Sequence, residues 1–389
     1  MKKSHLCNSR QKCLVAIKDY PGAFALIPPP TPLSIPLTGI HNELIRAHEA
    51  LSALKTLTAQ LPKPDIVMRT LDRREAVRSS QIEGTHSDVN DLFAYEATGS
   101  DEGLPSDVIV TMNYVKALDY GLNEIRHKQG VEALTTELIK SLHAHLMDGV
   151  KNFKGTPGEF RQIQNWIGGL KIYDARLVPP PANEIQKCMD DFESFLHYMP
   201  SEEDQMVVSI VLRMAIAHVQ FETIHPFIDG NGRVGRLLMP LMLAAEDYPP
   251  IYLAGFLKSH QNMYYETLAG VQLQEKWSEW IKFFAAGVEE AAHESIHTAK
   301  ALLSILDQWQ IAISQLGMRS DSVITKLPDL LIANPVVTVN QVKECLGISF
   351  PTANTVLNKL KEMGILEQAE KQRNRIFIAT EVIALLNAD

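Results

Sequence analysis

The chain has 389 residues, of which 46% are hydrophobic and 21% are charged, values close to those of ordinary globular proteins. This composition excludes a largely disordered chain, and the length predicts two or three domains at about 150 residues each. There are 37 basic side chains against 46 acidic ones, a formal net charge of −9. The acidic balance argues against a protein that binds mainly to nucleic acid or to membrane surfaces.

Membrane and secretory signals are absent from the sequence pattern. No apolar run approaches the roughly 18 residues of a membrane helix, since the best candidate, 206–219, contains Arg213 and His218. The basic start of the chain has no continuous apolar segment, so we expect a frayed tail, with a transit peptide as the weaker alternative. Four scattered cysteines form no C-x-x-C pair, which excludes a disulfide framework and a zinc site. We therefore expect a cytoplasmic protein.

Prolines interrupt the front of the chain, and helical periodicity dominates from Asp107 to about residue 316. A proline-rich arm at 28–36 should be extended, and 160–178, with Gly168 and Gly169 near its centre, predicts a hairpin that stops at Pro179. Apolar spacing predicts helices over 37–60, 66–80, 107–127, 135–148, 183–197, 202–220, 231–246 and 260–268, and a long helical stretch over 274–316.

From about residue 318 the pattern changes to short helices and β-branched residues. A helix closed by Gly347, a second helix from Ser349 to Met363 and an alternating segment that follows it predict a winged helix-turn-helix. Basic and acidic residues balance over 319–389, so DNA binding and protein docking or dimerisation stay equally open. The side chains that could contact DNA are Thr352, Asn354, Thr355, Asn358 and Lys359 in the second helix, and Lys371, Arg373 and Arg375 in the wing.

The segment 225–236, HPFIDGNGRVGR, carries the densest polar pattern. Glycines on both sides of an asparagine let backbone amides converge just before a helix, which makes an anion site. Arg233 and Arg236 lie three residues apart on the first turn, so they face the same anion. Asp229 would repel a phosphate unless it holds Mg²⁺, and His225 titrates near neutral pH. Each feature alone is common in loops, but their order here indicates phosphoryl or nucleotidyl transfer.

This segment matches, at every defined position, the signature H-x-F-x-[DE]-G-N-G-R-x-x-R of the Fic (filamentation induced by cAMP) family. The resemblance covers about 28–316 and implies a mainly α fold: a Fic-type helical bundle with a small β-hairpin flap, which transfers AMP from ATP to a hydroxyl side chain of a target protein. It implies that His225 deprotonates the target hydroxyl and that Asp229 binds Mg²⁺. The implied phosphate ligands are the backbone amides of Gly230, Asn231 and Gly232, and the side chains of Arg233 and Arg236.

Two further segments resemble features of the family. NWIG at 165–168, followed by LVPP at 177–180, matches the flap over the nucleotide, whose edge would pair with a segment of the target. NMYYETL at 262–268 matches the helix that lines the adenine pocket. An ordinary hairpin and core tyrosines are the alternatives. The implied ATP-binding residues here are Asn165, Trp166, Ile167, Gly168, Tyr264, Tyr265 and Gln272.

The segment SSQIEG at 79–84 resembles the family's inhibitory motif, [ST]-x-x-x-E-[GN], at Ser79, Glu83 and Gly84. The resemblance implies that Glu83 reaches Arg236 and occupies the γ-phosphate space, so that ATP binds with its α-phosphate misplaced. The local alternative is a helix end with a surface charge. The predicted domains are therefore an N-terminal extension with this inhibitory helix (1–106), a Fic catalytic domain (107–317) and the winged helix-turn-helix (318–389).

The sequence thus predicts a Mg²⁺- and ATP-dependent protein adenylyltransferase that also modifies itself and is autoinhibited by Glu83. Its partners would be ATP and a target protein docked along the flap, with a homodimer and DNA binding left open and no membrane partner. One alternative is a DNA-binding regulator whose Fic domain only senses nucleotide. Another is a Fic enzyme that uses a different nucleotide or removes AMP from targets.

Overall fold

The computed structural model describes residues 1–389 except 32–34, 36–37, 199–208, 318–321, 370–374 and 389. The chain forms two compact units, one of residues 1–55 and 116–292 and one of residues 56–115 and 293–389. Residues 56–115 thus pack with the C-terminal part of the chain. The units describe packing, and the three-domain division of the sequence remains a prediction. Three helices contribute residues to both units: α2 (His41–Gln60), α5 (Val108–Lys128) and α12 (Trp277–Ser314).

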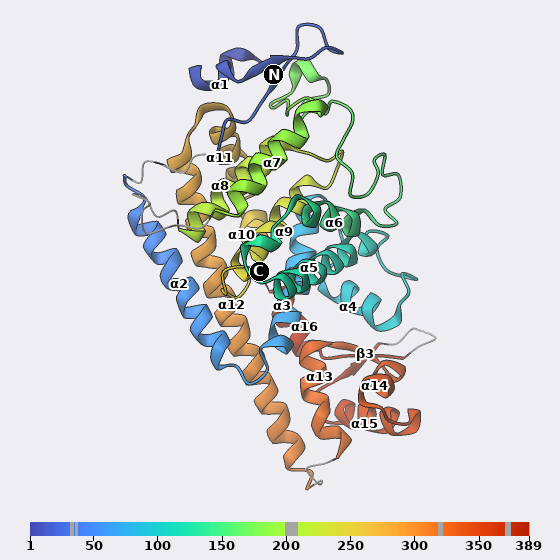
Figure 1. The fold of residues 1–389 in the computed structure, drawn as a ribbon. Coiled ribbons are helices and arrows are strands. Elements are labelled where there is room, and N and C mark those ends of the chain that lie inside the picture. The colour runs from blue at the N-terminus through green and yellow to red at the C-terminus, as the bar shows by residue number, and fades with distance from the viewer. Residues whose placement is uncertain (32–34, 36–37, 199–208, 318–321, 370–374, 389) are drawn as a thin grey trace. The chain divides into compact units, whose positions relative to one another are not determined.

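The first unit is built around α8 (Ile210–Ile224), in which every residue is buried. A helix that is enclosed on all sides needs little amphipathic character, because neighbours cover its whole surface. These neighbours are α7 (Ile185–Leu196), α9 (Asn231–Ala244) and α11 (Gln261–Gln274) (Figure 1). The loop that joins α8 to α9 therefore leaves from a rigid support. The remaining helices that lie wholly within this unit are α1 (Asn8–Lys12), α6 (Thr136–Met147) and α10 (Ala254–Ser259).

The start of the chain is folded, so the expected frayed tail is wrong. β1 (Leu14–Ala16) pairs antiparallel with β2 (Phe24–Leu26), and Leu6 is buried. The N-terminal ammonium of Met1 donates a 3.0 Å hydrogen bond to the Ile172 carbonyl. The segment packs as one layer against residues of 172–178. Strands of three residues are too short to show a period, and the contacts that order them come from a distant part of the chain.

The predicted hairpin at 160–178 forms a single antiparallel bridge in this fully described stretch, not a pair of strands. The backbone N–H of Ile167 donates to the Leu177 carbonyl (2.8 Å), and the Leu177 N–H donates back (3.2 Å). Gly168 and Gly169 bend the tip with φ values of +69° and +87°, and a Cβ atom on Gly169 would lie 2.6 Å from the Asp174 carbonyl oxygen. The bend is therefore too tight for another residue at Gly169.

The predicted helices are present, with ends that differ by a few residues. The helix predicted over 202–220 is described from Ile210 and runs on to Ile224, and its predicted first part lies outside the described residues. The sequence reasoning missed α1, α10, α4 (Val89–Thr98), α13 (Leu327–Ala333) and α16 (Thr380–Asn387). Of these, α4 carries a capping box between Asp88 and Asp91. None of the described helices is both long and apolar enough to cross a membrane.

The second unit combines α3 (Pro64–Ile82) and α4 with the C-terminal elements, which appear in red and orange in Figure 1. Its antiparallel sheet has the order β3–β5–β4. As expected, Gly347 closes α14 and the Ser349 hydroxyl accepts the first-turn N–H of Thr352 in α15. The elements fit the predicted winged helix, although Lys371 and Arg373 lie outside the described residues. The bounds are α13 (Leu327–Ala333), β3 (Val336–Thr338), α14 (Val339–Leu346), α15 (Phe350–Glu362), β4 (Glu367–Gln368), β5 (Ile376–Ile378) and α16 (Thr380–Asn387).

The helix α3 is joined to the C-terminal elements of its unit by side-chain hydrogen bonds. The Thr70 hydroxyl donates to the Ile332 carbonyl (2.9 Å), and Arg69 Nε donates to the Ala333 carbonyl (3.2 Å). Near the other end of the helix, Arg78 Nη2 donates to the Ala388 carbonyl (2.7 Å). The helix that ends in the predicted inhibitory motif is therefore held along its length by the C-terminal part of the chain.

Candidate active site

His225 stands at the C-terminus of α8 in the left-handed conformation, with φ +49° and ψ 59°. This backbone costs a residue with a Cβ roughly 1–2 kcal/mol, and such strain persists where the surroundings over-determine the geometry. The His225 N–H donates to the Phe221 carbonyl (2.9 Å), which ends the helix. Its imidazole is 20% exposed, and Nδ1 lies 3.8 Å from a carboxylate oxygen of the buried Glu222. The ring is thus accessible and has an acidic neighbour.

A pair of reciprocal hydrogen bonds fixes the loop after His225. The backbone N–H of Phe227 donates to Asn231 Oδ1 (2.9 Å), and Asn231 Nδ2 donates to the Phe227 carbonyl (3.0 Å). The Phe227 ring is buried and stacks on His143 with centroids 3.8 Å apart. Because its side chain holds the loop, the backbone amide of Asn231 is the group left to serve a phosphate, and that role remains a prediction.

Arg161 joins the loop to the flap, and sequence reasoning missed it. Its Nε donates to the His225 carbonyl (2.9 Å), Nη1 to Ile163 (3.0 Å) and Nη2 to Pro180 (2.6 Å). Its backbone N–H also bonds the Pro226 carbonyl (3.0 Å). The side chain is buried, and burial lowers the pKa of its guanidinium to about 10. A lone arginine 64 residues before the histidine carries no signal that separates it from a surface arginine.

The start of α9 is the segment predicted to bind an anion, and its geometry suits that role. Gly230 precedes the helix with φ +80°, and a Cβ there would lie 3.2 Å from Met147 Sδ. The first N–H groups of a helix have no intrahelical acceptor, and the helix dipole is positive at that end. Arg233 and Arg236 belong to the same turn and are 6% and 1% exposed. Amides and guanidinium groups are thus held in one place for an anion.

Asp229 is the one acidic residue of the loop, and its exposed side chain is the candidate Mg²⁺ ligand. One carboxylate oxygen accepts the N–H of Gly230 (2.6 Å). The described part of the chain contains no cluster of three His, Cys, Asp or Glu side chains that could hold a metal ion. A single carboxylate suits Mg²⁺, which keeps several waters and takes further oxygens from substrate phosphates. The residue fits the ion if the nucleotide supplies part of the ligand set.

The flap residues have different surroundings. Asn165 Nδ2 donates to the Phe227 carbonyl (3.2 Å), which brings it to the loop. Trp166 packs against the N-terminal layer, edge to face with Tyr20 at 6.2 Å. Ile167 makes the bridge described above, and Gly168 forms the bend. The structure thus places Asn165 beside the loop, and the ATP contacts of the four flap residues remain predictions.

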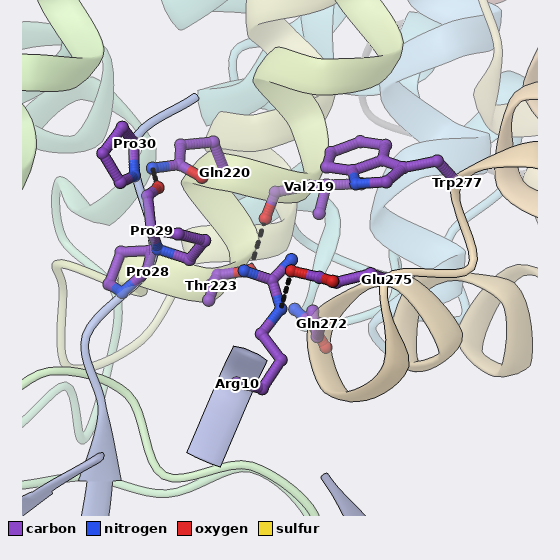
Figure 2. A pocket seen from close by; sticks show the side chains of 10 residues that line it. All are labelled: Arg10, Pro28, Pro29, Pro30, Val219, Gln220, Thr223, Gln272, Glu275 and Trp277. Carbon is purple, nitrogen blue, oxygen red and sulfur yellow. Dashed lines mark hydrogen bonds and ion pairs between the residues drawn. The ribbon is translucent and has the colours of Figure 1, made fainter. Parts of the chain in front are cut away.

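Of the three adenine-pocket candidates, Tyr264 and Tyr265 have ring centroids 4.8 Å apart, whereas Gln272 lies apart from them. The Tyr265 ring lies 5.9 Å from the guanidinium of Arg176 in the second limb of the flap. Tyr264 is buried, and its hydroxyl is bonded to His218 Nε2 (2.8 Å), as expected for a core tyrosine. Gln272 lines a separate pocket (Figure 2). Tyr265 is therefore the best placed of the three.

The inhibitory residues belong to the second unit. Ser79 is buried on α3, and the exposed Glu83 caps that helix with its N–H bonded to the Ser80 carbonyl (3.0 Å). Gly84 follows with φ +93°. The local geometry is that of a helix end closed by glycine, as predicted, and the inhibitory role itself remains a prediction.

Comparison with known proteins places this site in a family. The Fic/DOC family N-terminal model matches residues 41–123, and the Fic/DOC family model matches residues 133–243. Protein adenylyltransferase Fic of Aedes aegypti is 34% identical over 135 residues, and that of Drosophila yakuba is 36% identical over 135 residues. Each match covers 35% of this chain and 24% of the relative. The chain thus spans about a quarter of the length of these curated relatives.

Two crystal structures share the fold. One is a Fic family protein from Desulfovibrio desulfuricans G20, with a TM-score of 0.53 and 21% identity over 90% of this chain and 98% of that chain. The other is a Fic domain containing signaling protein from Bacteroides thetaiotaomicron VPI-5482, with a TM-score of 0.52 and 20% identity over 66% of this chain and 97% of that one. These structures show the fold alone. The two family models, at 41–123 and 133–243, confirm the resemblance: the chain belongs to the Fic/DOC family.

Proposed function

We propose that the protein is an adenylyltransferase that moves AMP from ATP to a hydroxyl side chain of a target protein and of itself. The observation that carries the proposal is the loop between α8 and α9. It holds an accessible histidine at a strained helix end, an exposed carboxylate and two buried arginines at a helix N-terminus. The names of the relatives from Aedes aegypti and Drosophila yakuba support the same chemistry.

His225 would act as the general base. It takes the proton of the target hydroxyl while the oxygen attacks the α-phosphorus, and the bond to the bridging oxygen breaks to release pyrophosphate. The Glu222 carboxylate, 3.8 Å from Nδ1, would stabilise the imidazolium that forms. The amides at the start of α9, with Arg233 and Arg236, would stabilise charge on the non-bridging oxygens. Mg²⁺ held by Asp229 would neutralise part of the charge of the triphosphate.

The flap offers a surface for the target. Leu170 is 95% exposed, Ile163 is 65% exposed and Tyr173 is 51% exposed, and all three belong to the 160–178 segment. Large apolar side chains gathered on one exposed segment are typical of contact surfaces. An extended target segment along the backbone of this bend would bring a hydroxyl toward the loop.

The test is transfer of label from α-labelled ATP to protein in the presence of Mg²⁺. Loss of a general base costs about 10²–10⁴-fold, so His225→Ala should lose transfer by that factor and still bind ATP. His127→Ala, at an exposed position of α5, is the matched control and should label like the wild type. Wild-type labelling by His225→Ala would refute the mechanism. Labelled UTP and release of AMP from a modified target, tested in parallel, separate adenylyl transfer from the other Fic chemistries.

We also propose that Glu83 lowers this activity. The proposal rests on the sequence motif and on the exposed position of Glu83 at the end of α3. Glu83→Gly should raise labelling, and a wild type that is 99% inhibited permits activation of at most about 100-fold. Glu102→Gly, another exposed acidic residue of the same unit, is the control. Equal labelling by the wild type and Glu83→Gly at saturating ATP would leave Glu83 as a surface charge.

A further inference from the structure

A second polar pocket lies within the first unit, outside the loop. Its walls come from α1, the proline arm, α8 and the end of α11, and its volume is about 120 Å³ (Figure 2). None of the residues of the 225–236 loop lines it, and neither do Tyr264 and Tyr265. The space exceeds what one water molecule needs, yet it lies well below the roughly 300 Å³ of a pocket for a drug-sized ligand. It therefore suits a ligand of a few non-hydrogen atoms.

The polar end of this pocket holds a cation whose hydrogen bonds are incomplete. Arg10 is 4% exposed, and its Nη2 donates to the Val271 carbonyl (3.3 Å). Its Nε and Nη1 are buried without a hydrogen-bond partner among the residues that the structure describes. Glu275 Oε1 is 3.9 Å from Nε, beyond hydrogen-bond distance. Burial lowers the pKa of this guanidinium and Glu275 raises it, but an arginine stays charged at neutral pH.

The chain holds Arg10 in place although burial of a charge with incomplete hydrogen bonds is unfavourable. The N–H of Cys7 donates to the Leu273 carbonyl (3.0 Å), which attaches the start of α1 to α11. Buried charges are normally matched by hydrogen-bonding partners, because unmatched donors lose the water they would otherwise bind. Two buried guanidinium nitrogens without an acceptor, on a side chain that lines a pocket, therefore indicate an acceptor that arrives from solvent.

The remaining lining residues define which acceptor fits. Gln272 is 4% exposed and lies beside Arg10, whereas Gln220 is engaged with the Pro29 carbonyl (3.2 Å). Prolines 28–30 on one side of the pocket and the Trp277 ring on the other supply its apolar surface (Figure 2). The nearby Glu275 carboxylate disfavours a dianion such as phosphate more than a monoanion. The pocket thus offers both hydrogen-bond donors and a short apolar surface.

We infer that this pocket binds a small monocarboxylate, whose oxygens accept hydrogen bonds from Arg10 and Gln272 and whose short alkyl group packs on the apolar surface of the prolines and Trp277. The site is separate from the nucleotide loop and does not depend on the proposed transfer. Guanidinium groups form strong, charge-assisted hydrogen bonds with carboxylates.

The experiment titrates sodium acetate and sodium propionate into the full chain at constant ionic strength, with sodium chloride as the reference salt. Tryptophan fluorescence follows Trp277, and thermal unfolding follows stabilisation. We expect a saturable response that Arg10→Met weakens at least 10-fold. Arg126→Met, an exposed arginine of α5, should leave the affinity unchanged. Trp277→Phe should lose much of the fluorescence change and retain the thermal shift.

Several outcomes would overturn the inference. They are an equal response of the wild type to chloride, and an unchanged acetate affinity in Arg10→Met. Inorganic phosphate is the third arm: if phosphate binds and Arg10→Met abolishes that binding, the site takes oxyanions in general and the carboxylate assignment is wrong. If circular dichroism shows that Arg10→Met is unfolded, the acetate affinity of Gln272→Leu tests the inference instead. This variant keeps the Arg10 guanidinium and removes the amide donor of Gln272. Wild-type acetate affinity in Gln272→Leu would then refute the site.

Discussion

Two buried arginines of the first unit, Arg161 and Arg10, have different partners from Arg73 and Arg74 of the second, although Arg213 of the first unit is also paired with a carboxylate, that of Glu246. In the second unit, Arg73 donates to Glu96 Oε1 through Nε (3.2 Å) and Nη2 (3.0 Å), and Arg74 pairs with Glu294 at 3.1 Å. In the first unit, Arg161 donates to three backbone carbonyls and Arg10 retains two unmatched nitrogens. A guanidinium matched by a carboxylate is electrically neutralised, whereas one matched by carbonyls keeps most of its positive field. The first arrangement serves folding, and the second also suits a site that receives anions.

The largest effect should come from Arg161→Met. The buried Pro180 carbonyl and the part-buried carbonyls of His225 and Ile163 would lose their donor, and a fully buried unmatched group costs about 1–3 kcal/mol, so we expect a loss of stability of about 3 kcal/mol. The loop would also lose its attachment to the flap, and a displacement of about 1 Å can cost about 10²-fold in rate. Urea unfolding and AMP transfer to protein measure the two effects. Wild-type transfer by a folded Arg161→Met protein would show that this contact does not position the loop.

The matching change in the second unit is Arg73→Met. It leaves the carboxylate of Glu96, whose side chain is 9% exposed, with Arg69 as its remaining cationic partner, and should cost about 3–5 kcal/mol in urea unfolding. The double variant Arg73→Met, Glu96→Leu should recover much of the loss, because a buried ion pair replaced by apolar groups is often neutral. No such rescue is available for Arg161, whose acceptors are backbone. A double variant as unstable as the single one would contradict the distinction between the two kinds of arginine.

The loop predicts a dependence of stability on pH. His143 Nδ1 accepts the Gly158 N–H (2.9 Å), so Nε2 carries the proton and donates to the Asp229 carbonyl (3.1 Å). Burial lowers the pKa of His143 to about 4. The contribution of His143 to the free energy of unfolding is complete above pH 6.5, where its ring is neutral in both the folded and the unfolded state. It falls between pH 6.5 and about 4, where only the unfolded state binds the proton.

Urea unfolding at pH 7.0, 5.5 and 4.5 measures this pH-dependent contribution of His143 to the free energy of unfolding. His143→Gln should be less stable than the wild type at pH 7, and the difference should shrink as the pH falls. His218 also contributes to the slope in both proteins, because burial lowers its pKa to about 3. A difference between the two proteins that is constant with pH would mean that His143 is not held neutral.

Sequence reasoning recovered the parts of the molecule that local patterns encode. The loop from His225 to Arg236 is contiguous, so its residue types and spacing were visible without a fold, and helices with clear apolar spacing were found. Residues that act across long sequence separations were missed. Arg161 meets His225 from 64 positions away, and Arg10 meets Val271 from 261 positions away. The strands β1 and β2 are three residues each, too short for periodicity, and depend on packing against 172–178.

The smallest effect should come from an exposed ion pair, which tests whether burial or pairing separates the arginines. Lys63 Nζ lies 2.5 Å from Asp329 Oδ2, but its side chain is 57% exposed. Water solvates both partners when the pair breaks, so Lys63→Met should change the free energy of unfolding by less than about 1 kcal/mol, against about 3–5 kcal/mol for Arg73→Met. Urea unfolding of the two variants under one set of conditions makes the comparison. If Lys63→Met destabilised the protein as much as Arg73→Met, the stability of the second unit would depend on its ion pairs regardless of burial. The claim that burial makes the Arg73 pair more important would then be wrong.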